Sequence, residues 1–424
     1  MERYSSYKDS NVSWIGMIPE HWGSKQLRSF LTLFTEKGHG EAQLLSVTRE
    51  QGVIERDIED KEENHNFVPE DLSGYKYIEK GDFAINKMKA WQGSYAVSDY
   101  CGIVSPAYFT CKLQGVNKQF FSRAIRSKAY IPFFTQYSKG IRVGQWDLNP
   151  NALKSIPFFL PPLSEQEKIV SYLENKTSKI DDYVADKEKE IELLQELKQK
   201  AIADAVTKGL NPNAKMKDSG ISWIGEIPEH WEVKQLRSFL TLFTEKGHGD
   251  AQLLSVTHEQ GVIERDKEDK EENHNFVPDD LSGYKYIEKG DFAINKMKAW
   301  QGSYAVSEYN GIVSPAYFTC KLKGVNKDFF SKAIRSKVYV PFFTQYSKGI
   351  RVGQWDLNPN ALKSIPFFLP PSDEQQAIVA YIEEKCEKID KLASELQSEI
   401  DYLKEYKQRL IADVVTGQVN VQNK

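Results

Sequence analysis

Few residue groups in this 424-residue chain have the types and spacing that catalysis requires. Glu59-Asp60-Lys61 has the Glu-x-Lys form of a nuclease site, but it lies in a run of charges typical of a solvated loop. Asn149-Pro150-Asn151-Ala152 departs at its third and fourth positions from the Asn-Pro-Pro-Phe motif of amino-methyltransferases. His21 and His39 lack companions at ligand spacing, and there is no Gly-x-x-x-x-Gly-Lys-[Ser/Thr] loop for ATP phosphates. The sequence predicts a non-catalytic protein without a metal site or cofactor, in which His21 beside Trp22 is structural.

The distribution of charge points to another kind of function. The formal net charge is -4, but it averages over opposing regions. Residues 50–82 are rich in Asp and Glu, whereas residues 100–155 hold eight basic residues and one acidic residue. Residues 309–364 hold nine basic residues and two acidic ones. A basic face is the electrostatic footprint of a phosphate-backbone partner, and a solvated basic surface is the alternative.

The chain is a duplication. Residues 12–209 align with residues 221–418 at a constant offset of 209, without an insertion or deletion. Between 25–162 and 234–371, 11 of 138 positions differ, whereas 23 of 44 differ between 164–207 and 373–416. Two copies that are nearly identical outside their last segment suggest that the target is itself repeated.

Each copy begins with a lobe of mixed secondary structure. The opening Trp-Ile-Gly-x-Ile-Pro-Glu-His-Trp, at Trp14 to Trp22 and Trp223 to Trp231, predicts a turn-rich entry with aromatic anchors. Short apolar runs broken by Gly, Pro, Asn and Asp predict strands. These runs are Leu44–Thr48, Asp82–Ile85, Ser94–Val97 and the stretch from Ile103 to Thr110. Phe120 to Ser127 has helical spacing, so we expect an α+β lobe.

The hydrophobic period changes after Pro161-Pro162-Leu163. Ser164-x-x-Glu167 has the form of a capping box and opens roughly 43 residues of heptad-like helical pattern, which ends at Gly209. The second copy repeats this pattern from Ser372 or Asp373 to Thr416. Because neither helix can bury its seam alone, we expect the two to form an antiparallel coiled coil with internal pseudo-two-fold symmetry. The alternative is that each helix packs on its own lobe.

The composition indicates a cytoplasmic protein. No apolar run reaches the ~20 residues of a membrane span, and the first residues lack the apolar region of a signal peptide. The four cysteines show no metal-type spacing, which favours free thiols in a reducing compartment.

The junction between lobe and helix carries a resemblance to a known family. Pro161-Pro162-Leu163-Ser164-Glu165-Gln166-x-x-Ile169 returns as Pro370-Pro371-Ser372-Asp373-Glu374-Gln375-x-x-Ile378. This sequence resembles the junction of specificity subunits of Type I restriction-modification systems. The Trp-Ile-Gly openings and the order of lobe, long helix, lobe, long helix are also similar, so the resemblance covers nearly the whole chain. Family members usually carry two dissimilar lobes, whereas these are nearly the same.

The resemblance implies a domain layout and a function. The domains would be a first target recognition domain (1–162), a central conserved spacer helix (163–210), a second target recognition domain (211–371) and a distal conserved spacer helix (372–424). Each lobe would read half of a bipartite site in double-stranded DNA, and the helices would fix the gap between the halves. Two methyltransferase subunits would methylate adenine with S-adenosylmethionine, and restriction/translocase subunits would translocate and cleave DNA with ATP. The specificity subunit itself would need no cofactor.

Two segments of each lobe carry the residue types that contact DNA. Residues 86–93 and 138–146 interrupt the strand pattern with basic, amide and aromatic side chains. The predicted contacts are Lys87, Lys89, Gln92, Arg142 and Gln145, with counterparts Lys296, Lys298, Gln301, Arg351 and Gln354. Trp91 and Trp146 could stack on DNA or anchor their loops.

Nearly identical lobes about a two-fold axis predict an interrupted palindrome as the target. Arg49 is replaced by His258 near a strand end, where it could relax one base pair of that palindrome on one side. A self-contained DNA-modifying enzyme and a coiled-coil protein scaffold remain the alternative functions.

Overall fold

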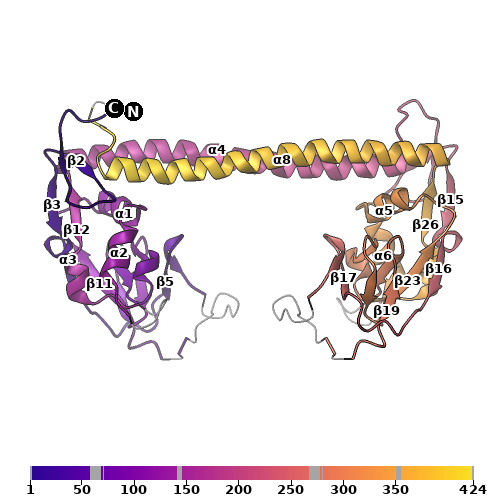
Figure 1. The fold of residues 1–424 in the computed structure, drawn as a ribbon, viewed down its shortest axis with the longest axis horizontal. Coiled ribbons are helices and arrows are strands. Elements are labelled where there is room, and N and C mark those ends of the chain that lie inside the picture. The colour runs from indigo at the N-terminus through magenta and orange to yellow at the C-terminus, as the bar shows by residue number, and fades with distance from the viewer. Residues whose placement is uncertain are drawn as a thin grey trace. The chain divides into compact units, whose positions relative to one another are not determined.

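The computed structural model describes residues 2–57, 68–69, 71–140, 146–266, 277–278, 280–349 and 355–422. The chain divides into two compact units (Figure 1). Unit 1 comprises Met1–Glu188 and Ser398–Lys424, and unit 2 comprises Lys189–Gln397. Each unit contains one lobe together with part of each of two long helices.

The lobe of unit 1 is built around an antiparallel sheet of four strands in the order β4-β11-β8-β9. Its strands are β1 (Tyr7–Asp9), β2 (Met17–Pro19), β3 (Gly23–Gln26), β4 (Leu31–Phe34), β5 (Leu45–Thr48), β6 (Gly52–Glu55), β7 (Lys76–Ile78), β8 (Phe83–Asn86), β9 (Tyr95–Val97), β10 (Gly102–Val104), β11 (Tyr108–Leu113) and β12 (Pro157–Leu160). In the central strand β11, Cys111 faces Leu33 on one side and Phe83 on the other. Smaller antiparallel pairs surround this sheet: β1 with β2, β3 with β12, β5 with β6, and β7 with β10.

Three α-helices and two single-turn helices complete the lobe. They are α1 (Lys118–Arg126), α2 (Ile131–Tyr137), α3 (Pro150–Ser155), η1 (Leu27–Ser29) and η2 (Ala90–Gln92). Asn117 caps α1 by accepting a hydrogen bond from the Phe120 amide, and Asn149 caps α3 in the same way. The predicted strands and the helix near 120–127 are confirmed, whereas α2 and α3 were not predicted.

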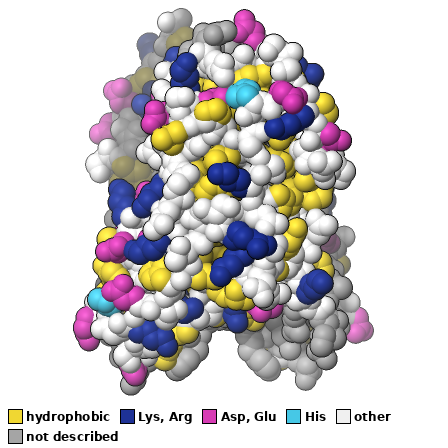
Figure 2. Space-filling view, turned by 90° about the vertical axis from the view of Figure 1, so that its left-hand side faces the viewer, with side chains coloured by type: hydrophobic (Ala, Val, Ile, Leu, Met, Phe, Trp, Pro, Cys, Tyr) yellow, Lys and Arg dark blue, Asp and Glu magenta, His cyan; other side chains and the backbone are white. Residues whose placement is uncertain are grey.

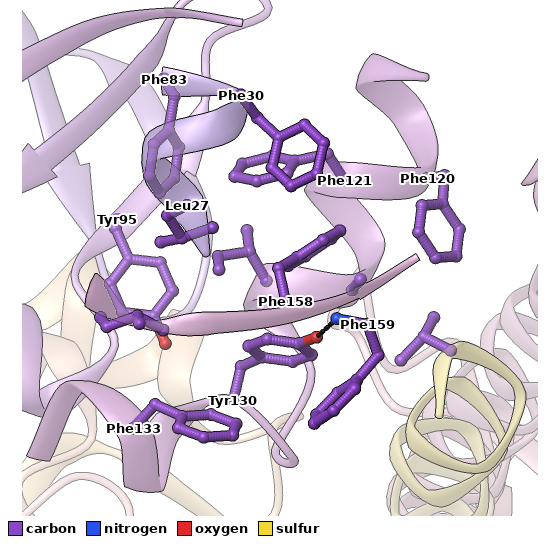
Figure 3. Close-up of a cluster of buried hydrophobic side chains, with 14 of the residues drawn as sticks. Leu27, Phe30, Phe83, Tyr95, Phe120, Phe121, Tyr130, Phe133, Phe158 and Phe159 are labelled. Carbon is purple, nitrogen blue, oxygen red and sulfur yellow. Dashed lines mark hydrogen bonds between the residues drawn. The ribbon is translucent and has the colours of Figure 1, made fainter. Parts of the chain in front are cut away.

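Aromatic rings dominate the core of this lobe (Figure 3). The Phe158 ring lies 5.1 Å from that of Phe121 and 5.3 Å from that of Tyr130. The buried Tyr130 hydroxyl accepts a hydrogen bond of 3.0 Å from the Phe159 amide, so its one polar atom is satisfied. Since each such side chain contributes roughly 1.5–3 kcal/mol on burial, this cluster holds α1, α2 and β12 in place.

Unit 2 repeats this lobe with the sheet order β16-β23-β20-β21. Its strands are β13 (Met216–Asp218), β14 (Glu226–Pro228), β15 (Glu232–Gln235), β16 (Leu240–Phe243), β17 (Leu254–Thr257), β18 (Gly261–Glu264), β19 (Lys285–Ile287), β20 (Phe292–Asn295), β21 (Tyr304–Val306), β22 (Gly311–Val313), β23 (Tyr317–Leu322), β24 (Ser347–Lys348), β25 (Asp356–Leu357) and β26 (Pro366–Leu369). Its short helices are η3 (Leu236–Ser238), η4 (Ala299–Gln301), α5 (Lys327–Arg335), α6 (Val340–Tyr346) and α7 (Pro359–Ser364). The expected α+β class is confirmed for both lobes.

The two long helices, α4 (Leu163–Lys208) and α8 (Ser372–Val415), run antiparallel within each unit. In unit 1, Asp181 pairs with Lys407 at 2.6 Å and Glu188 pairs with Lys404 at 3.0 Å. Residue numbers therefore rise along α4 as they fall along α8. In unit 2, Lys198 pairs with Asp390 at 2.7 Å. The predicted antiparallel pairing is confirmed. Among the described residues, no helix combines the length and apolar character that crossing a membrane requires.

The helix pair is also continuous with the core of each lobe. In unit 1, Ile169 and Leu173 of α4 and Val414 of α8 are fully buried in the same apolar cluster as the lobe aromatics. The alternative that each helix packs on a lobe therefore describes part of the arrangement. The predicted capping box is wrong in position, because α4 begins at Leu163 and Ser164 lies inside its first turn.

Candidate nucleic-acid interface

In each lobe the structure brings the first segment that was predicted to contact DNA against the described ends of the second. In unit 1 the loop between Lys139 and Asp147 is closed at its base by two backbone hydrogen bonds, of 3.1 and 2.9 Å, between these residues. Next to this base, the Leu148 amide donates to the Lys87 carbonyl at 3.0 Å. The end of β8 and the base of the loop therefore form one continuous surface element.

The tryptophans of the two segments fasten this element together. The Trp91 ring lies 5.2 Å from the Trp146 ring, and the Trp91 indole donates to the Met88 carbonyl at 3.2 Å. From α2, the Thr135 hydroxyl donates to the Trp91 carbonyl at 3.1 Å. Both rings are half-buried, so these contacts support the alternative in which the tryptophans anchor their loops.

The predicted polar side chains differ in how far they reach solvent. Lys89 and Gln92 are exposed, and Lys87 is half-buried at the end of β8. Arg142 and Gln145 lie outside the described residues. The three described side chains thus lie on one short stretch beside the base of the loop that carries the other two, and their contact with DNA remains a prediction.

Unit 2 has the same arrangement. The Leu357 amide donates to the Lys296 carbonyl at 3.1 Å, and the Trp300 and Trp355 rings lie 5.1 Å apart. Lys298 and Gln301 are exposed, and the half-buried Lys296 ammonium lies 3.7 Å from the Asp356 carboxylate. Arg351 and Gln354 lie outside the described residues.

Lys76 lies near both Lys37 and Lys87, and neither Lys76 nor Lys37 was predicted from the sequence. Lys76 on β7 is half-buried, and its ammonium donates to the Tyr108 carbonyl at 2.5 Å. Burial lowers the pKa of Lys76, and the positive charges of Lys37 and Lys87 lower it further. These three lysines form a positive cluster beside the predicted segment, the kind of feature that attracts phosphate.

The same cluster recurs in unit 2 as Lys246, Lys285 and Lys296. Burial and the charges of its two neighbours lower the pKa of Lys285. No sequence signal could have found these residues, because a strand, a loop and a turn far apart in the chain bring them together.

The basic charge of residues 100–155 is partly neutralised in the fold. Lys112 pairs with Glu79 at 2.7 Å and with Asp82 at 2.8 Å. The half-buried Arg126 donates to backbone carbonyls rather than to carboxylates. Figure 2 shows one face of unit 1, on which Lys and Arg side chains are dispersed over the middle while carboxylates lie mainly toward the rim. The net charge of the segment therefore overstates the charge available to a partner.

The Pro-Pro-x-x-Glu-Gln junction joins the lobe to its helix. The Glu165 carboxylate accepts hydrogen bonds from the indole of Trp22 at 3.1 Å and from the hydroxyl of Tyr4 at 2.5 Å, and it lies 2.7 Å from the His21 ring. The buried Gln166 side chain accepts from the Asn117 amide and donates to the Pro161 carbonyl. The structural role predicted for His21 is confirmed.

The chain is similar over most of its length to three named specificity subunits. No protein-family model matches the chain. It is 24% identical to the protein named as the type I restriction enzyme MjaX specificity subunit of Methanocaldococcus jannaschii, over 98% of each chain. It is 26% identical to the MjaVIII specificity subunit of the same organism, over 78% of this chain and 79% of that protein. It is 22% identical to the EcoKI specificity subunit of Escherichia coli K12, over 76% of this chain and 69% of that one.

A solved structure has the same fold. A chain from a structure of the assembly and conformational transition of a type I restriction-modification system superposes with a TM-score of 0.61. The two are 14% identical, and the match covers 95% of this chain and 99% of that one. The similarity to named specificity subunits over most of the chain supports a specificity subunit of a type I restriction enzyme, which agrees with the expected role as a non-catalytic subunit.

Proposed function

We propose that the chain reads a bipartite DNA sequence and directs the modification and restriction of that DNA by partner subunits. The observation that supports the proposal is that segment 86–93 lies against the described ends of the loop between Lys139 and Asp147, through the Trp91 and Trp146 rings and the Leu148 amide, with equivalent contacts in unit 2. Basic and amide side chains on such an element can contact phosphates and base edges. The similarity to type I specificity subunits supports this function over an enzyme with its own active site or a protein scaffold.

The target is an interrupted palindrome. The lobes are identical at 127 of the 138 positions between 25–162 and 234–371, and they carry the same predicted contact residues. Equivalent surfaces bind equivalent bases, so two such lobes related by a two-fold axis read a half-site and its reverse complement. The domains that do this are the lobes 1–162 and 211–371, and the spacers are 163–210 and 372–424.

The partners are two methyltransferase subunits and the restriction/translocase subunits. Adenine methylation with S-adenosylmethionine and DNA translocation with ATP belong to those subunits. The duplicated junction supports one methyltransferase for each half of the chain. A measured complex mass with two methyltransferases per chain at saturation supports this stoichiometry, and one at saturation contradicts it.

Methylation mapping tests the function. DNA exposed to this chain with its methyltransferase partner should show methylated adenines in a single motif: a short half-site, an unread gap and the reverse complement of the half-site. Two unrelated half-sites contradict the palindrome, and the absence of any motif contradicts the function.

Replacing Arg142 and Arg351 together with Ala tests the predicted contacts. Each lost base contact should weaken binding of the mapped motif by about 1–3 kcal/mol. If these residues contact only phosphates, all sequences should weaken alike and the salt dependence should flatten. Unchanged affinity in a folded double variant removes both residues from the interface.

A further inference from the structure

One of the few differences between the lobes lies beside the predicted contact segment. Arg49 stands in the turn between β5 and β6, and its side chain is 66% exposed. A Cβ atom added to Gly93 would lie 3.8 Å from Cγ of Arg49 and 3.9 Å from Cδ1 of Ile131. Gly93 ends the segment that contains Lys89 and Gln92. Arg49 therefore extends the predicted interface beyond that segment.

The turn that carries Arg49 is held rigidly. The Arg126 guanidinium donates to the carbonyls of Arg49 at 3.0 Å and Glu50 at 2.8 Å, and also to the carbonyl of Tyr95 at 3.2 Å. Arg126 is thereby committed to the backbone, while the Arg49 side chain reaches into solvent. Its charged neighbour is Glu50, at 3.3 Å.

A cleft of about 900 Å³ opens beside this turn, between the lobe of unit 1 and α8. Its basic lining residues are Arg49, Arg123, Arg126, Lys128, Lys404 and Lys407, against the acidic Glu50 and Glu405. Several of these cations are already paired: Arg123 with Glu174, Lys404 with Glu188 and Lys407 with Asp181. Lys128 is exposed and forms no ion pair among the described residues. Arg49, whose pair with Glu50 is exposed to solvent and therefore weak, and Lys128 thus supply the positive charge that a ligand could meet.

Unit 2 has fewer positively charged side chains at the equivalent positions. His258 replaces Arg49 beside Gly302, on a turn that Arg335 holds through the carbonyls of His258 and Glu259. Lys337 is the counterpart of Lys128, and Gln195 stands where unit 1 has Lys404. Arginine is always charged, whereas a histidine side chain is ordinarily mostly neutral at neutral pH. The backbone frame is therefore the same in both units, and the available charge differs by one.

We propose that this cleft of unit 1 binds DNA phosphates beside the half-site through Arg49 and Lys128, and that unit 2 makes one phosphate contact fewer because His258 replaces Arg49. The proposal rests on the proposed function, since it assumes that the neighbouring segment 86–93 lies on DNA. Phosphate is the ligand that fits, because the available charged groups, Arg49 and Lys128, are cations on an exposed surface, and cations of this kind contact the DNA backbone. The two halves of a palindromic site are then held with unequal strength.

The chain offers a matched set of variants. Arg49→His makes both turns histidine, His258→Arg makes both arginine, and the double exchange restores one of each with the units swapped. Binding of the full chain is measured over a range of salt concentrations, on a duplex with the mapped motif and on a scrambled duplex of equal length. One phosphate contact contributes about 0.9 to the slope of log K against log salt, which corresponds to about eightfold in affinity at 0.1 M salt.

We expect the variants to form an ordered series in DNA-binding affinity. His258→Arg binds about eightfold more tightly than the wild type with a steeper slope, Arg49→His binds about eightfold more weakly, and the double exchange matches the wild type. Both duplexes should respond alike, and the methylated motif should not change. Lys128→Ala and Lys337→Ala should each flatten the slope by a similar amount.

Two outcomes overturn the proposal. One is the same slope of log K against log salt in all variants. The other is a change of the methylated motif at one base pair, which would assign Arg49 a base contact instead. Thermal unfolding of each variant checks that it folds. A wild-type chain that binds both duplexes equally contradicts the proposed function. The differences in salt dependence among the variants would still test the cleft.

Discussion

Equivalent carboxylates, Glu165 in unit 1 and Glu374 in unit 2, join the lobe to its long helix, but their surroundings differ. In unit 2, Glu374 accepts from the Trp231 indole at 3.0 Å and lies 2.8 Å from the His230 ring, and its side chain is 21% exposed. In unit 1, Glu165 makes the equivalent two contacts, and only 4% of its side chain is exposed. It also accepts from Tyr4 and, at 3.2 Å, from the Gln422 side chain.

The extra cover in unit 1 comes from two segments that are remote in sequence. Residues 2–7 and 417–422 pack together there: the Asn420 amide donates to the Glu2 carbonyl at 2.9 Å, and the Tyr7 hydroxyl donates to the Gly417 carbonyl at 3.1 Å. Unit 2 is one continuous stretch, 189–397. A duplicated motif therefore keeps its partners within the repeat, while its burial depends on the chain that surrounds it.

The largest expected effect tests what the two junctions share. Trp22 and Trp231 are 0% and 1% exposed, so replacing either with Ala should destabilise its own unit by about 3–5 kcal/mol. Hydrogen exchange of peptides from each lobe would measure this. If the two substitutions lower the free energy of unfolding of their units by amounts that differ by several kcal/mol, the two cores are not equivalent.

Removing residues 417–424 tests the cover that only unit 1 has. Val419 and Val421 are 2% and 0% exposed, and the loss of each buried valine should cost unit 1 about 1.5–3 kcal/mol. Protection of unit 2 against hydrogen exchange should stay as in the wild type and serves as the internal control. Equal destabilisation of both units would contradict the assignment of this segment to unit 1.

Replacing each anchor carboxylate with Gln sharpens the comparison. Glu165→Gln should cost unit 1 about 1–3 kcal/mol, because buried donors of Tyr4 and Trp22 lose a charged acceptor. Glu374→Gln should cost unit 2 less, because its carboxylate has fewer partners and more solvent. Denaturant unfolding of the two variants measures the difference, and Tyr4→Phe, which removes the Tyr4 bond but leaves the Glu165 carboxylate and its other partners in place, is the control. A larger cost in unit 2 would reverse the comparison.

The smallest effect is a dependence on pH. Burial raises the pKa of Glu165, but hydrogen bonds from Tyr4, His21 and Trp22 outweigh it and hold the pKa below its ordinary value. The ionised anchor therefore adds stability that is complete above the ordinary value of about 4.3 and is lost as the pH falls through the lower folded value. The stability difference between the wild type and Glu165→Gln should shrink on acidification below about pH 4. A difference that stays constant down to pH 3 would show that ionisation of Glu165 does not matter.

The sequence predicted those elements whose signal is local. The duplication, the long helices and most strands follow from period and alignment, because hydrophobic spacing along one segment determines which face it buries. Ile131–Tyr137 was missed as a helix, since its aromatic and branched residues favour strands in isolation. Burial of Phe133 and Phe134 in the lobe core outweighs that preference.

By itself, the sequence determined that this protein has two nearly identical lobes, each joined to a long helix by a Glu-Gln junction. Tertiary structure decided which residues meet. It placed Lys37 and Lys87 near Lys76 and closed the Tyr4 and Gln422 side chains over Glu165. Spacing along the chain carries no information about such contacts, because packing of the whole unit fixes the distance between segments separated by tens to hundreds of residues.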